Sequence, residues 1–89
     1  MAGEWTWDID PLARKVFLAL PDAAQEALYA LMVEITGDDP RGIRQMAAAI
    51  DPGGHMERLP FGGGAGIVTI LIVVRGKHVQ IVQIIWAGP

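Results

Sequence analysis

Residues 58–70 read "RLPFGGGAGIVTI", and this stretch decides the fold of the chain. Glycine occupies positions 62–64 and 66. A glycine-rich loop that binds phosphate leads into a helix, whose first N–H groups and dipole face the anion. Here the glycines lead into "IVTILIVV", whose β-branched residues are typical of a strand. The stretch therefore predicts a hairpin loop between two strands, and not a phosphate site.

The segments beside this loop predict two neighbouring strands. "HMERLPF" (residues 55–61) precedes it, and Pro60 indicates an edge strand or a bulge, because proline donates no ladder hydrogen bond. "GIVTILIVV" (residues 66–74) follows it and is apolar on both faces, which suits a central strand.

A further hairpin is expected at the C-terminal side. "RGKH" (residues 75–78) predicts a tight turn, with Gly76 at positive φ. "VQIVQIIW" (residues 79–86) is the last strand. Gln80 and Gln83 are an odd number of residues apart, so they are expected on opposite faces of the sheet.

The beginning of the chain predicts a strand and then a helix. Apolar and polar residues alternate in "EWTWDI" (residues 4–9), which is the period of a half-buried strand. Asp10 suits an N-cap and Pro11 suits the first helical position, so a helix is expected over residues 11–20. Its apolar positions are Leu12, Ala13, Val16, Phe17 and Leu20, and Pro21 ends it.

A second helix follows after one or two residues, so the two helices are expected to form an antiparallel hairpin. Asp22 is its expected N-cap and Gly37 its expected C-terminal glycine. One apolar face recurs at helical spacing: Ala24, Leu28, Leu31, Met32 and Ile35. The order β-α-α-β-β-β in a single domain, residues 1–89, predicts an α+β fold, with a helical hairpin packed on a twisted antiparallel sheet.

Composition and charge narrow the class of protein. The chain has 89 residues, 52% of them hydrophobic, and no cysteine, which excludes disulfides and cysteine-based metal sites. No signal peptide or membrane helix is expected, so we predict a cytoplasmic protein. The net charge of −3 disfavours nucleic acid as a partner. Only residues 53–89, with one acidic and three basic side chains, could form a basic patch.

The chain resembles the RelE/ParE superfamily, the small toxins of bacterial type II toxin–antitoxin pairs, in the order and pattern of its segments. After the opening strand these are "PLARKVFLALP", "AQEALYALMVEI", "ERLPFGGGAGIVTILI" and "KHVQIVQIIWAG". The resemblance covers nearly the whole chain. It implies a toxin that binds a cognate antitoxin through apolar surface on the sheet or beside the helices. Its target would be ribosome-bound mRNA, cleaved without a metal or cofactor, or gyrase.

Two departures from the family pattern bear on activity. Ribonucleases of the family usually follow the glycine of this strand with an aromatic residue and an arginine, whereas here Ile67 and Val68 follow Gly66. They usually also carry basic, aromatic or His residues after the last strand, where this chain reads "WAGP". RNA cleavage needs cations at the scissile phosphate and an acid or base near the 2′-hydroxyl. The resemblance therefore implies weak or degenerate endonuclease activity, or gyrase inhibition.

The candidate catalytic residues are Arg58, as a phosphate contact, and His55, as an acid or base. Alternatively, Arg58 is only a surface cation beside Glu57, and His55 is only an exposed loop residue. Strand alternation places His55 and Glu57 on one face and Arg58 on the other. The candidate RNA contacts, which alternatively only keep the surface soluble, are Arg41, Arg44, Arg75, Lys77 and His78. A ribonuclease that uses Arg58, His55 and the 75–78 turn is a third interpretation.

The tryptophans and the apolar composition carry further interpretations. Trp5, Trp7 and Trp86 either stack on bases or, as we expect for at least two of them, pack in the core or an interface. No set of His, Asp and Glu has the spacing of a metal site, so no metal or cofactor is expected. The alternative function is a non-catalytic protein-interaction module, with a homodimer as one form, because both faces of the last two strands read as apolar.

Overall fold

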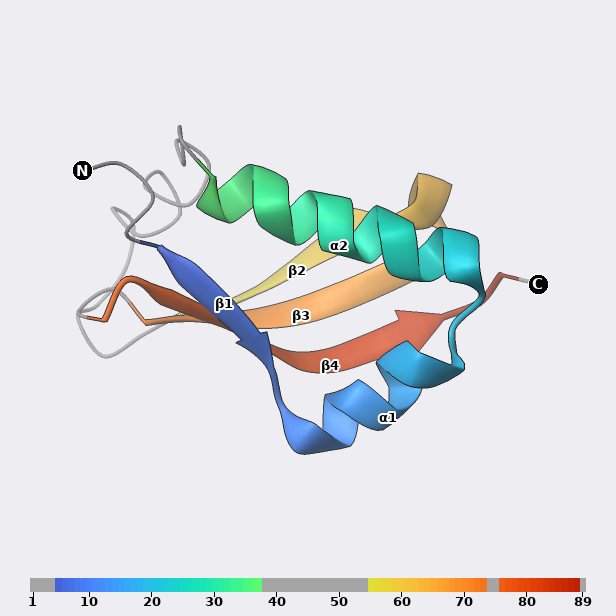
Figure 1. The fold of residues 1–89 in the computed structure, drawn as a ribbon. Coiled ribbons are helices and arrows are strands. Elements are labelled where there is room, and N and C mark those ends of the chain that lie inside the picture. The colour runs from blue at the N-terminus through green and yellow to red at the C-terminus, as the bar shows by residue number, and fades with distance from the viewer. Residues whose placement is uncertain (1–4, 38–54, 74–75, 89) are drawn as a thin grey trace.

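The computed structural model of the chain describes residues 5–37, 55–73 and 76–88. Its elements, in order, are β1 (Thr6–Ile9), α1 (Pro11–Ala19), α2 (Asp22–Thr36), β2 (His55–Phe61), the 3-10 turn η1 (Gly62–Gly64), β3 (Gly66–Val73) and β4 (His78–Trp86). The α+β class is confirmed, and within the described residues the elements follow the predicted order β-α-α-β-β-β. Figure 1 shows both helices on one face of the sheet.

The sheet has four strands in the order β1-β4-β3-β2. β2 pairs antiparallel with β3, and β3 pairs antiparallel with β4, but β1 pairs parallel with β4. The expectation of a wholly antiparallel sheet is therefore wrong, and the sheet is mixed. No hairpin joins β1 to β4, since the rest of the chain lies between them, and such a long connection permits parallel pairing.

Helix α1 begins and ends where the sequence predicts. The Asp10 side chain accepts a hydrogen bond from the Leu12 N–H at 3.1 Å, and Pro11 opens the helix. Ala13 and Leu20 are buried and Phe17 is partly buried. Leu12, one of the apolar positions that predict the helix, is 75% exposed, and Val16 is also exposed. The helix touches mainly β4, so it buries a narrower face than its apolar residues suggest.

Helix α2 buries Leu28 and Met32 completely. Its ends differ from the prediction, because Pro21 is the N-cap and Asp22 the first helical residue. Gly37, at φ −79°, is extended and not left-handed. A Cβ there would lie 2.7 Å from the Val33 carbonyl oxygen, so steric contact explains this glycine. Within the described residues, no helix is long and apolar enough to cross a membrane.

The two helices do not pack along each other as a tight hairpin would. α1 lies against β4, whereas α2 lies against β1, β2 and η1. Figure 1 shows the helices diverging from the corner between Leu20 and Asp22, with β1 crossing the opening. The core lies between α2 and the two central strands, and its fully buried side chains are Leu28, Met32, Val68, Ile70, Ile72, Val79 and Ile81.

Strand β4 contains a bulge that the sequence did not predict. Thr69 pairs with Gln83 and Ile70 pairs with Ile81, so Val82 is the extra residue. The bulge moves Gln80 and Gln83, which pair with Leu71 and Thr69, onto the same face of the sheet. The expectation of opposite faces is therefore wrong. β4 is apolar on the core face and mostly polar on the other.

The glycine stretch forms the hairpin loop that the sequence predicts. Gly62, Gly63 and Gly64 all have positive φ, at 63°, 71° and 95°, and the loop leads into strand β3. In the turn before β4, the left-handed residue is Lys77, at φ 50°, and not Gly76. The prediction for Gly76 is therefore wrong.

Candidate functional site

The two candidate catalytic residues lie on the edge strand β2. The backbone of His55 pairs with Ile72, and that of Arg58 pairs with Thr69. Arg58 is exposed, and strand alternation places it on the sheet face that the helices leave uncovered. Glu57 pairs with Ile70, which faces the core. The predicted separation of Glu57 and Arg58 onto opposite faces is confirmed.

The basic turn lies far from Arg58. His78 begins β4 and pairs with Val73, and its Nδ1 is 2.9 Å from the Thr6 hydroxyl. Arg58 and His78 share the uncovered face but are two strands and four residues apart, which is roughly 16 Å between backbones. They therefore do not form one catalytic site. The Lys77 carbonyl accepts a hydrogen bond from the Thr6 N–H at 2.9 Å. Arg41, Arg44 and Arg75 lie outside the described residues.

All three tryptophans pack against the hydrophobic core and are partly buried. The Trp86 ring stacks on Phe61, with centroids 5.7 Å apart and planes at 28°. Trp7 meets the edge of Tyr29, with centroids also 5.7 Å apart and planes at 65°. The expectation that at least two tryptophans pack in the protein is confirmed.

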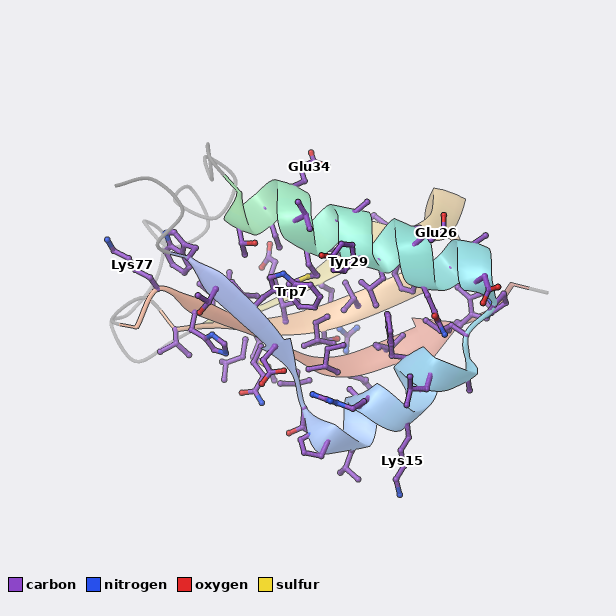
Figure 2. The ribbon with its side chains drawn as sticks, in the orientation of Figure 1. Trp7, Lys15, Glu26, Tyr29, Glu34 and Lys77 are labelled. Atoms are coloured by element: carbon purple, nitrogen blue, oxygen red, sulfur yellow. The ribbon has the colours of Figure 1, made fainter. Side chains whose placement is uncertain are left out.

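A cleft lies between β1 and α1, and we call it the helix-side cleft. It is lined by Trp7, Asp8, Ile9, Arg14, Phe17 and Leu18, and its volume is about 280 Å³. Figure 2 shows Trp7 and Tyr29 in the opening between the two helices. Leu18 is 68% exposed and Tyr29 is 57% exposed, although both are large apolar side chains. The cleft therefore presents uncovered apolar and aromatic surface, with the Arg14 guanidinium 3.4 Å from the Asp8 carboxylate.

Gln25 fixes the corner from which the helices diverge. Its side-chain amide donates to the carbonyl oxygens of Phe17, Leu18 and Leu20, at 3.0, 3.3 and 3.2 Å. These carbonyls lie at the end of α1, where the Phe17 carbonyl also accepts the Leu20 backbone N–H at 3.1 Å. The amide thus ties the end of α1 to the beginning of α2.

A second hollow lies between the helix corner and the glycine loop. Its volume is about 410 Å³, and it is lined by Pro21, Ala23, Ala24, Gly62, Ala65 and Trp86. This lining is apolar, and no lysine or arginine contributes to it. The surroundings of the loop are therefore those of a packed turn and not of a phosphate site.

The sheet face away from the helices is the second uncovered surface, and we call it the open face. On its two central strands lie exposed Ile67 and Ile85, near the η1 end, and partly buried Leu71 further along β3, with Thr69 and Gln83 between them. At its two edges lie charged residues of opposite sign, Arg58 on β2 and Asp8 on β1. The open face therefore carries apolar and polar side chains on its central strands and charges of opposite sign at its margins.

The comparisons with known proteins give no match. No protein-family model matches the chain. No curated protein and no solved structure is similar to it. The resemblance to the RelE/ParE superfamily therefore stays a prediction. The surfaces of the chain itself are what indicates its function.

Sequence reasoning missed Leu18 and Tyr29 as surface residues. A signal for Leu18 was present, because it lies outside the face that Ala13, Phe17 and Leu20 share at helical spacing. Tyr29 follows Leu28 and so also lies beside the buried face of α2. Apolar residues off the main helical face were the pointer to the helix-side cleft.

Proposed function

We propose that the chain is the toxin-type member of a RelE/ParE-like toxin–antitoxin pair, and that it binds its protein partner in the helix-side cleft. The observation that carries this proposal is the divergence of α1 and α2, which leaves aromatic and aliphatic side chains uncovered. Contiguous exposed apolar surface on a small protein is typical of protein–protein contact.

The cleft suits an apolar side chain at the centre of a partner segment. Its floor is formed by Trp7 and Phe17, and Leu18 stands exposed at its rim. Large apolar anchors that fill such pockets supply most of the binding free energy at protein interfaces. An amphipathic helix or extended segment of an antitoxin, with an aliphatic or aromatic residue in the cleft, fits this surface. The Arg14–Asp8 pair at the rim would add polar contacts.

The first experiment tests the proposal in cells. The chain is expressed in a bacterium alone and together with the protein encoded beside its gene. We expect growth arrest or slowing with the chain alone, relief on co-expression, and co-purification of the two proteins. Unaffected growth together with the failure of the two proteins to co-purify would contradict the proposal.

A non-catalytic interaction module is the second candidate function. The observation that favours it is the distance of roughly 16 Å between the backbones of Arg58 and His78. RNA cleavage requires a cation and an acid or base close to the same phosphate group. RNA cleavage by the purified chain is compared with that by Arg58→Ala. Cleavage that Arg58→Ala reduces by tenfold or more would favour the mRNA endonuclease instead.

A further inference from the structure

We propose that the open face binds a second copy of this chain, so that two sheets pack face to face around a two-fold axis parallel to the strands. The proposal uses the sheet face opposite the helices, which shares Asp8 with the helix-side cleft, and it does not depend on the proposed function. Three features carry it: exposed apolar side chains on the two central strands, charges of opposite sign at the two margins, and charges on β2 that disfavour edge-to-edge pairing.

Several apolar side chains of the open face are exposed. Ile67 and Ile85 pair directly across β3 and β4, and both are exposed. Met56, on the edge strand β2, is 59% exposed. Because β3 and β4 are the two central strands, Ile67 and Ile85 lie midway between the sheet edges, near the η1 end, where sheet-on-sheet packing would bury them.

Edge-to-edge pairing of two copies is disfavoured by charge. β2 is the outer strand at one side of the sheet. If two β2 strands paired antiparallel about a two-fold axis, Glu57 would lie opposite Glu57 or Arg58 opposite Arg58 in the central registers. Like charges directly opposite destabilise a strand pair. At the other edge, the Asp8 carboxylate accepts the N–H of Ile9 at 2.7 Å and so occupies a backbone donor of β1.

The charged margins select one face-to-face arrangement. A two-fold axis parallel to the strands places β2 of one copy over β1 of the other, and therefore Arg58 over Asp8 twice in the dimer. An axis across the strands would instead place β2 over β2 and bring the two Arg58 side chains together. Only the first arrangement pairs opposite charges.

The distances permit this contact. Arg58 lies at the level of Thr69 and Asp8 at the level of Leu71, two residues further along β3. With sheets about 10 Å apart, the two Cα atoms would be about 12 Å apart, which an arginine and an aspartate side chain bridge. In the described part of the chain Arg58 has no ion-pair partner. The Asp8 Oδ1 atom accepts from both the Ile9 N–H and Arg14, which leaves Oδ2 to accept from the second copy.

The size of the face sets the expected strength. Four strands of this length present roughly 400–500 Å² per copy. Stable complexes bury about 800 Å² per partner, so the dimer should be weak and in rapid exchange. We expect a dissociation constant on the order of 100 μM.

The test is sedimentation equilibrium from about 10 μM to about 1 mM protein, a range that brackets this constant. Arg58→Asp and Asp8→Lys should each raise the dissociation constant at least about tenfold, because each brings like charges together twice. An equimolar mixture of the two variants should associate as tightly as the unaltered chain, since the mixed dimer contains two opposite-charge pairs. Lys15→Glu and Glu26→Lys, which alter charge on the helices, are the matched controls (Figure 2).

Arg14→Ala removes the same intramolecular ion pair as Asp8→Lys without changing the open face, and it should dimerise normally. Circular dichroism establishes that each variant is folded. A chain that stays monomeric at about 1 mM would overturn the proposal. A mixture that associates no more tightly than its two components would overturn it equally.

Discussion

Single residues decide how tightly the end of the sheet packs. A Cβ on Gly66 would lie 2.4 Å from the Phe61 ring, and one on Gly62 would lie 2.8 Å from Trp86. These two rings stack on each other beside the turn. Two of the four glycines of this stretch, Gly62 and Gly66, therefore let aromatic rings approach the backbone, whereas a Cβ on Gly63 or Gly64 would meet no atom within 4 Å.

Replacement of Gly66 tests this packing. Gly66→Ala should lower the free energy of unfolding by about 1–3 kcal/mol, because the added methyl group forces the Phe61 ring to move. Gly76→Ala is the control, since its Cβ would lie 3.9 Å from the nearest atom, and it should change stability by less than about 0.5 kcal/mol. Urea unfolding measures both. Equal changes in the free energy of unfolding would show that the close approach of Gly66 to Phe61 does not affect stability.

Replacement of Gln25 tests the hydrogen bonds at the helix corner. Gln25→Ala should cost about 1 kcal/mol of stability, because the carbonyl oxygens of Phe17 and Leu20 lose a protein donor. Glu26→Ala, at the neighbouring exposed position, should stay within about 0.5 kcal/mol of the unaltered chain. Thermal unfolding of the two variants compares their stabilities directly. Equal midpoint temperatures would show that the Gln25 side chain does not stabilise the helix corner.

Among the elements, β4 shows how one extra residue changes a surface. The bulge at Val82 keeps Val79, Ile81 and Ile84 on the core face. Without it, an unbroken alternation from Val79 would turn Ile84 away from the core. Because of the bulge, β4 presents one apolar face and one largely polar face, with both of its glutamines on the polar face.

Single-residue deletions test the bulge. Deletion of Val82 should give a folded protein, because Ile81 and Ile84 then keep their faces in a regular ladder. Deletion of Thr69 should unfold the protein or destabilise it by several kcal/mol, since Ile70 and Ile72 turn toward the open face. Circular dichroism and urea titration separate the two. A ΔVal82 protein as unstable as the ΔThr69 protein would contradict the register described above.

Local signals allowed much of the fold to be predicted. The Asp10–Pro11 start of α1, the edge position of β2 and the hairpin at the glycines depend on short-range chemistry, and all three are confirmed. The direction of β1 and the bulge in β4 depend on pairing between residues far apart in sequence, so no local pattern reveals them. The exposure of Leu12 follows from how little of α1 touches the sheet.

The candidate site could be predicted only in part. The sequence identifies Arg58 and His78 as cations near strands, but their separation appears only once the strand order is known. The helix-side cleft lies between β1 and α1, and how a helix packs beside a strand is not encoded by helical spacing. The sequence indicates that apolar residues such as Leu18 belong to a helix, but it does not indicate that they are exposed.

At the scale of the whole molecule, two uncovered surfaces lie on opposite sides of one sheet. The helix-side cleft is bounded by α1 and β1, and the open face lies behind the sheet. This arrangement predicts that the two contacts are independent. Leu18→Lys should leave self-association unchanged, and Arg58→Asp should leave partner binding unchanged, because neither residue belongs to the other surface. Sedimentation and titration calorimetry measure the two contacts, and a variant that weakens both would show that they are coupled.

The central claim, that the helix-side cleft binds the partner, is tested most directly by comparing two leucines of α1. Leu18 and Leu12 are 68% and 75% exposed, but only Leu18 lines the cleft. The measurement is titration calorimetry of the protein encoded beside the gene against Leu18→Lys and Leu12→Lys. We predict that Leu18→Lys weakens binding at least about thirtyfold, a loss of about 2 kcal/mol, and that Leu12→Lys binds like the unaltered chain. Equal affinities of the two variants would contradict the claim.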